Sequence, residues 1–237
     1  MFGISSYCLM DKPLGEALDT LAEMTGLIEV MDEGLHFIAD PKLFESYSQE
    51  FTIHAPFHGM NIASVFEPVR KASVDVTASC FAVAAEIGAA VVVHPGYYAW
   101  AQEKEEADRQ FRQSLEELRA TADELSLAFS FENMGDMNFF NLRTPESLSL
   151  IDGTGFTLDV GHAHLNGRLP AFLETDFSHM HIHDNNGKKD SHDAIGAGTI
   201  DFAPVVAALK RRNATSVIEV KSFEGVKSSL AALNRLS

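Results

Sequence analysis

The chain has 237 residues, of which 46% are hydrophobic and 22% are charged, a composition that predicts one globular domain over residues 1–237 and excludes a disordered protein. Its 34 acidic residues against 18 basic ones give a formal net charge of −16, which disfavours DNA as a partner because phosphate binding relies on Lys and Arg. Two cysteines are too few for a secreted disulfide scaffold, and no apolar run could span a bilayer, so we expect a cytoplasmic protein without membrane contact.

Short β-branched or apolar segments alternate with longer amphipathic segments along the chain, a pattern typical of repeated βα units. The predicted strands are Phe2–Ser6, Leu27–Met31, Glu50–His54, Ala90–His94, Leu127–Glu132, Gly155–Asp159, Phe177–His183 and Ser216–Val220. The predicted helices are Leu14–Met24, Pro41–Tyr47, Glu67–Ile87, Glu103–Leu125, Pro145–Ile151, Leu169–Glu174, Phe202–Lys210 and Gly225–Leu236. Eight strands that are each followed by a helix predict an α/β protein with a closed (β/α)8 TIM barrel.

A doubly wound open sheet is the alternative fold. Such a sheet usually carries a glycine-rich phosphate turn after its first strand. Residues 5–13 of this chain read SSYCLMDKP at that place and contain no glycine. The sequence therefore favours the barrel.

Side chains that can bind metal lie at the ends of six consecutive predicted strands, where the active sites of such barrels are found. On their strands, His94 and Glu132 follow Val93 and Phe131, so strand alternation predicts that the polar side chains face the barrel interior. The complete set is His54, His94, Glu132, Asp159, His162, His181 and Glu219.

Each of these residues alone is explained more simply as a hydrogen-bonded core residue, because histidines are often partly buried. Together they are costly to bury unless they are paired, hydrogen-bonded or bound to a cation. His, Asp and Glu ligands suit zinc, manganese and iron. The set therefore predicts a divalent-metal site and a metal-dependent enzyme.

The loop after the seventh predicted strand adds Asp190 and His192 ahead of Gly196 and Gly198. The spacing Asp-x-His suits two ligands from one loop. Taken alone, the same residues are equally typical of a turn in which Asp accepts backbone hydrogen bonds. The surrounding strand ends favour the first interpretation.

With these residues in place, the chain resembles the xylose isomerase-like TIM barrel superfamily (AP endonuclease family 2), which includes endonuclease IV and many sugar isomerases and epimerases. The resemblance covers nearly the whole length. Its most specific parts occur in the expected order and are HPG at 94–96, FEN at 131–133, LDVGH at 158–162, and the segment from His181 to Gly198.

The resemblance implies one to three divalent ions, zinc or manganese. In the endonuclease IV pattern, the first ion would bind His54, His94 and Glu132, the second Glu132, Asp159, His181 and Glu219, and the third His162, Asp190 and His192. In the one-metal isomerases and epimerases, the second set alone would hold the ion, and the other histidines would hold substrate. His179, His181 and His183 share one strand face, and the resemblance selects His181 as the ligand.

Two functions stay open. We favour an isomerase or epimerase of a small sugar-like substrate, phosphorylated or not, in which Glu132 and Glu219 transfer the proton and His162 orients substrate oxygens. The alternative is an endonuclease IV-like phosphodiester hydrolase with several zinc ions, which the nine matching residues favour and the acidic charge disfavours. A metal-binding module without catalysis ranks last.

Further residues are assigned to substrate binding or to structural roles. The predicted substrate contacts are His54, His94, His183, Trp100 and Lys188. The aromatic residues Phe57, Tyr97, Tyr98, Trp100, Phe139 and Phe140 would form an apolar wall or would simply cover the barrel top. Structural or solvent-facing roles are expected for His36, His58, His164 and His179. The sequence makes no prediction of oligomeric state.

Overall fold

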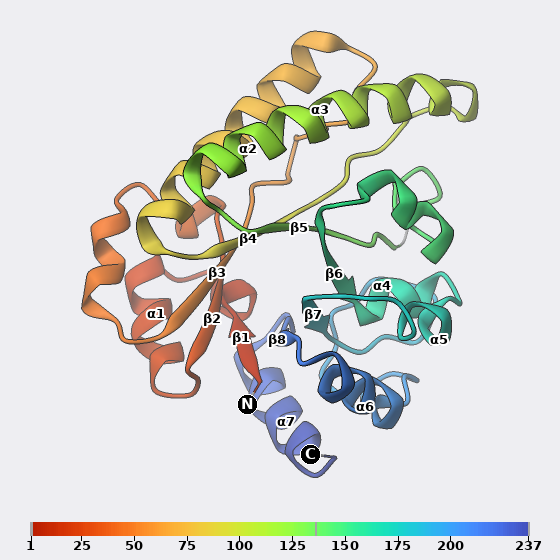
Figure 1. The fold of residues 1–237 in the computed structure, drawn as a ribbon. Helices are drawn as coiled ribbons and strands as arrows, with labels where there is room; N and C mark the ends of the chain where they lie inside the picture. Colours follow the sequence, from red (N-terminus) through yellow and green to blue (C-terminus); the bar gives the residue numbers. More distant parts are fainter. Residues whose placement is uncertain (1, 136, 237) are drawn as a thin grey trace.

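A computed structural model describes residues 2–135 and 137–236. Eight parallel strands follow one another around a closed barrel, in which β1 pairs with both β2 and β8 (Figure 1). The strands are β1 (Gly3–Ser5), β2 (Leu27–Met31), β3 (Glu50–His54), β4 (Ala90–Val93), β5 (Phe129–Glu132), β6 (Gly155–Asp159), β7 (His179–Ile182) and β8 (Thr215–Ile218). The predicted TIM barrel is confirmed.

Helices surround the barrel, and the two longest, α2 and α3, lie side by side along one flank (Figure 1). The α-helices are α1 (Leu14–Ala22), α2 (Glu67–Ile87), α3 (Lys104–Leu125), α4 (Val160–Leu165), α5 (Leu169–Phe172), α6 (Phe202–Arg212) and α7 (Phe223–Asn234). The 3-10 segments are η1 (Ser6–Leu9), η2 (Gly34–His36), η3 (Pro41–Ser46), η4 (Ala101–Glu103) and η5 (Pro145–Ile151). None of the helices within the described ranges is long and apolar enough to cross a membrane.

Three details of the prediction were wrong. The segments after β2 and β5 that were predicted as helices are the 3-10 segments η3 and η5, because short stretches that begin at Pro make only a few turns. The helix α4 was missed, because its residues carry the Asp-x-x-His pair and were assigned to a strand end. Asp159 caps this helix by accepting a hydrogen bond from the backbone N–H of His162 at 2.6 Å.

One face of the strands packs in the apolar core outside the barrel, and the other face carries polar side chains into the barrel interior. On β7, Met180 and Ile182 are fully buried in the hydrophobic core, whereas His179 and His181 contact carboxylates of other strands inside the barrel. The same alternation holds on β2, where Glu29 lies between Ile28 and Val30. The barrel interior therefore carries the ionisable groups, and the strand ends present them at the mouth.

Candidate metal centre

An open pocket occupies the barrel mouth at the carboxyl ends of the strands. Its lining residues are Tyr7, Met31, His54, Phe57, His58, His94, Glu132, Met134, Gly135, Met137, Phe140, His162, Asp190, His192 and Glu219. The other two predicted ligands, Asp159 and His181, are both 0% exposed. The structure thus brings all nine predicted metal ligands to one end of the barrel.

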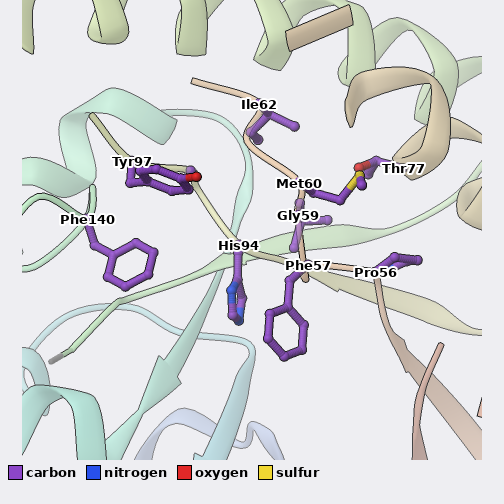
Figure 2. Close-up of a pocket in the computed structure, with 11 residues that line it drawn as sticks. Pro56, Phe57, Gly59, Met60, Ile62, Thr77, His94, Tyr97 and Phe140 are labelled. Atoms are coloured by element: carbon purple, nitrogen blue, oxygen red, sulfur yellow. The ribbon is translucent and has the colours of Figure 1, made fainter. Parts of the chain in front are cut away.

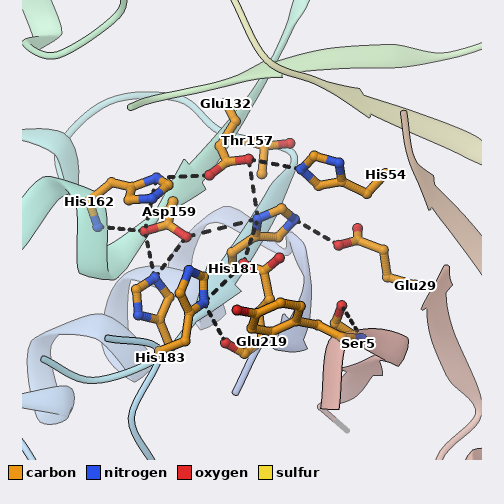
Figure 3. Close-up of polar contacts among 12 residues, drawn as sticks. Ser5, Glu29, His54, Glu132, Thr157, Asp159, His162, His181, His183 and Glu219 are labelled. Atoms are coloured by element: carbon orange, nitrogen blue, oxygen red, sulfur yellow. Dashed lines mark hydrogen bonds and ion pairs between the residues drawn. The ribbon is translucent and has the colours of Figure 1, made fainter. Parts of the chain in front are cut away.

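The imidazole of His181 lies at the centre of this arrangement (Figure 3). Its Nδ1 is 3.5 Å from Oε2 of Glu132, 3.9 Å from Oδ2 of Asp159 and 3.5 Å from Oε2 of Glu219. These carboxylates come from β5, from β6 and from the residue that follows β8. The carboxyl groups from the ends of β5, β6 and β8 therefore face the same space as Nδ1 of His181 from β7.

On the β3–β5 side, two histidines approach a single carboxylate oxygen. Oε2 of Glu132 lies 3.4 Å from Nε2 of His54 and 3.3 Å from Nε2 of His94. The two rings are perpendicular, with centroids 4.8 Å apart. The other oxygen of Glu132 lies 2.9 Å from Nδ1 of His162, so this residue bridges both sides of the mouth.

On the β6–β7 side, the carboxylate of Asp190 in the loop after β7 contacts two imidazoles. Oδ2 of Asp190 lies 3.0 Å from Nε2 of His162 and 3.2 Å from Nε2 of His192. The ring of His192 stacks on that of His183 with centroids 3.9 Å apart. His183 in turn places Nε2 3.1 Å from both oxygens of Asp159. This side therefore forms a second cluster of ligand atoms.

The loop that carries Asp190 and His192 is organised by Asp184. Its carboxylate accepts hydrogen bonds from the backbone N–H groups of residues 185, 196, 198 and 200, at 2.9, 2.9, 2.9 and 3.2 Å. A Cβ at Gly198 would lie 2.3 Å from Oδ1 of Asp184, so only glycine permits this approach. His192 itself has a left-handed φ of 42°, a costly conformation that the surrounding contacts maintain.

The pKa values of the carboxyl groups in the centre are shifted in opposite directions. Burial would raise the pKa of Glu132, but the contact with His181 and other histidines lowers it. Burial would likewise raise the pKa of Asp159, but His162 and His183 lower it. Burial dominates at Glu219, whose pKa is raised. Two neighbouring carboxyl groups with opposite shifts are the usual arrangement for an acid and a base at one site.

The residues of the centre fit a divalent cation. Nδ1 of His181 is buried and makes no hydrogen bond, although three carboxylates face it. A mixed set of imidazole and carboxylate donors suits zinc or manganese. Within the described residues, ligand atoms within 4.8 Å of one another occur in the groups His54/His94/Glu132, Glu132/Asp159/His162, Asp159/His183/Glu219, His162/His183/Asp190/His192 and Glu29/His179/His181.

Three predicted substrate residues do not line the pocket. His183 is 0% exposed and bonded to Asp159, because Gly161 leaves room for its ring directly against the α4 backbone. Trp100 is 63% exposed and lines a separate groove with Phe66 and Tyr98. Lys188 is exposed on the loop after β7. The expectation that these side chains contact substrate is not supported by their positions.

The predicted aromatic wall is formed in part. Phe57 and Phe140 line the central pocket, and with His94 and Tyr97 they also border an apolar side pocket (Figure 2). Tyr98 and Phe139 instead pack against each other, with ring centroids 5.5 Å apart. The wall therefore consists of the rings that flank His94.

Sequence reasoning missed Glu29 and undervalued His179. Glu29 is 0% exposed, and its Oε1 lies 3.0 Å from Nε2 of His181. Burial would raise the pKa of Glu29, but His181 and His179 hold it well below its usual range. The available signal was a lone carboxylate inside the apolar strand LIEVM, since a charge in such a strand requires a buried partner.

Comparison with known proteins identifies relatives along almost the whole chain. The model of the family described as xylose isomerase-like TIM barrel matches residues 41–236. An uncharacterized protein of Methanocaldococcus jannaschii is 34% identical over 231 residues, which cover 93% of this chain and 92% of that protein. The probable endonuclease 4 of Mycobacterium leprae is 28% identical over 214 residues, which cover 82% of each.

Among solved structures, a D-tagatose 3-epimerase-like protein has the same fold, with a TM-score of 0.92 and 31% identity over 99% of this chain and 96% of that one. The family match extends over far more than half of the chain. The chain therefore belongs to the xylose isomerase-like TIM barrel family.

Proposed function

We propose that this protein is a divalent-metal-dependent isomerase or epimerase of a small sugar-like molecule. The observation that carries the proposal is the convergence of three carboxylates on Nδ1 of His181, with the pKa of Glu219 raised and that of Glu132 lowered. The similarity to a D-tagatose 3-epimerase-like protein supports this class of substrate.

Four residues would hold the cation: Glu132, Asp159, His181 and Glu219. When bound, it would polarise a substrate carbonyl and the adjacent hydroxyl. This polarisation acidifies the C–H proton of the carbon that bears the hydroxyl. Glu132 and Glu219 are the carboxylates that would take the carbon-bound proton and return one; in the metal-free protein the pKa of Glu132 is lowered and that of Glu219 is raised. His162 lies 2.9 Å from Glu132 and orients substrate oxygens beside it.

The pocket suits a small molecule with both polar and apolar faces. Carboxylates and imidazoles form its floor, while Phe57, Phe140 and Met137 contribute apolar surface at its rim. A sugar presents hydroxyl groups at its edge and C–H groups on its face, which matches this division. The net charge of −16 opposes a nucleic-acid substrate.

The test combines metal analysis with solvent exchange. Protein purified without added metal or chelator should contain about one divalent ion per chain, and ketoses incubated with it in D2O should gain deuterium at the carbon that is epimerised, as seen by NMR. Glu219→Gln should abolish this exchange. Asp32→Asn is the matched control, because Asp32 is also buried at the mouth end of β2, and its Oδ1 accepts a hydrogen bond from the backbone N–H of Ile38. Exchange that persists in Glu219→Gln would contradict the proposal.

A second candidate, hydrolysis of phosphodiesters with several zinc ions, is favoured by the separate cluster of His162, Asp190 and His192. Clustered ions can stabilise both the attacking and the leaving oxygen of such a reaction. About three zinc ions per chain, with no deuterium exchange and with cleavage of a phosphodiester, would favour this candidate over the first.

A further inference from the structure

A buried carboxylate lies inside the barrel directly beneath the metal centre. Glu29 of β2 is fully enclosed, and its Oε1 is 3.0 Å from Nε2 of His181, on the opposite side of the ring from the three carboxylates (Figure 3). Neither of these two atoms makes a hydrogen bond within the described residues, so their contact is an ion pair. The imidazole of His181 therefore has Glu29 on one side and the candidate metal ligands on the other.

The second oxygen of Glu29 is fixed by neighbouring strands. Oε2 accepts a hydrogen bond from the hydroxyl of Thr52 at 3.0 Å and lies 3.1 Å from Nε2 of His179. His179 is held in turn, because its Nδ1 is 2.7 Å from Oγ1 of Thr215. Thr52 faces Glu29 in the register of β2 and β3, and Thr215 faces His179 in that of β7 and β8. The carboxylate is thus anchored by three strands and has little freedom to turn.

The position of this carboxylate selects one tautomer of His181. When His181 gives up one proton to bind a cation, the negative charge of Glu29 3.0 Å from Nε2 favours keeping the proton there, which leaves the lone pair on Nδ1, the atom that faces Glu132, Asp159 and Glu219. We propose that Glu29 is a positioning residue that fixes the ring and the tautomer of His181 for metal binding. The inference rests on the metal site of the proposed function, and a carboxylate behind a ligating histidine also makes that histidine a stronger ligand.

The test uses metal binding rather than turnover. Chelator-stripped wild type and variants are titrated with Mn²⁺ or Zn²⁺ by calorimetry. Glu29→Met, which keeps the volume and removes both acceptors, should weaken the affinity by about 10- to 100-fold without changing the number of ions bound. Glu29→Gln keeps one acceptor oxygen and should lose less. The matched control Asp32→Asn, a buried carboxylate of the segment after β2, should bind metal like wild type.

A second readout follows the His181 ring in the zinc-loaded protein. With ¹⁵N-labelled histidine, wild type loaded with Zn²⁺ should show His181 protonated at Nε2 only, and Glu29→Met should show a mixture of ring states. Circular dichroism checks that each variant is folded. If Glu29→Met does not fold, Glu29→Gln carries the test, and its expected signature is a smaller but measurable loss of affinity.

Three outcomes would overturn the inference, and they can be told apart. Unchanged affinity and an unchanged tautomer in the Glu29 variants would overturn the positioning role and leave the proposed function intact. Loss of one whole equivalent of metal, with the remaining sites unaffected, would make Glu29 a ligand instead. A wild-type protein that binds no divalent metal would overturn the proposed function and this inference with it.

Discussion

The two sides of the barrel mouth present imidazoles to carboxylates in different ways. On the β3–β5 side, His54 and His94 share one oxygen of Glu132, and all three residues lie at or directly after strand ends. On the β6–β7 side, Asp190 and His192 come from a loop whose conformation depends on Asp184. The first side is therefore fixed by the barrel itself, and the second is fixed by a loop that could change without changing the barrel.

Electrostatics separates the two sides further. Burial lowers the pKa of His94, although Glu132 opposes this shift. At His192, burial also acts to lower the pKa, but Asp190 and Glu219 outweigh it and raise the pKa to about 9. In the metal-free protein at neutral pH, His94 is therefore neutral and His192 is charged. A cation approaching the second side has to displace a proton, whereas one approaching His94 does not.

The largest loss of activity is expected from a change at Glu219, where the two sides of the mouth meet. Glu219 lies 3.5 Å from Nδ1 of His181, and its backbone carbonyl lies 2.9 Å from Nδ1 of His192. Glu219→Gln should reduce kcat by about 10²- to 10⁴-fold, because a ligand and a proton-transfer group are both lost. Steady-state kinetics with the substrate found by deuterium exchange measures it, and full activity would contradict the assignment of the whole site.

Truncating one histidine on each side tests which side carries out the chemistry. In a one-metal isomerase, His192→Ala should leave kcat within about tenfold of wild type and the metal content unchanged. In a hydrolase with three ions, the same change should remove one ion per chain and cripple turnover, as should His94→Ala. Elemental analysis and kinetics on both variants decide between the two, and equal losses of metal and activity would show that the sides act as one unit.

The loop dependence of the second side is tested at Asp184. Asp184→Ala leaves four backbone N–H groups without their acceptor, which should cost about 1–3 kcal/mol of unfolding free energy. Metal or substrate contacts through Asp190 and His192 should weaken, while those through His54 and His94 should persist. Urea unfolding and metal titration measure the two effects, and Asp32→Asn is a control for loss of a buried carboxylate elsewhere. Unchanged stability would show that the loop folds without Asp184.

The opposite pKa shifts predict opposite pH dependence in chelator-treated protein. His192 has a pKa of about 9 in the folded state and about 6.5 when unfolded, so its stabilisation is complete below about pH 6.5 and is lost as the pH rises through 9. His94 has a lowered pKa, so it destabilises the fold as the pH falls below about 6.5. Thermal unfolding of His192→Gln and His94→Gln against pH should give differences from wild type of opposite sign at pH 5.5.

The smallest effect is expected at the rim. Trp100 is exposed and lies in a groove separate from the central pocket, so Trp100→Ala should change KM by less than about twofold. Phe57→Ala, which removes a ring from the pocket lining, is the matched comparison and should raise KM more. A larger effect at Trp100 than at Phe57 would show that substrate extends over the α2–α3 side of the mouth.

The sequence by itself determined the barrel and the nine candidate ligands. The alternation of βα units is a local pattern, and a parallel barrel gathers all of its strand ends on one side, so residues such as His54 and Glu219 had to meet. Two of the predicted helices became 3-10 segments, because the preference of short segments that begin at Pro is too weak for sequence to distinguish them.

Only the tertiary structure decided which neighbours each group has. Glu29 and His181 are far apart in the chain, and their contact depends on the radius and register of the closed barrel, which no local pattern encodes. His183 has the same residue type and strand face as His181, but Gly161 and Asp159 enclose it beneath the pocket surface. Residue type and strand parity establish what a side chain could bind, and packing across the barrel establishes what it contacts.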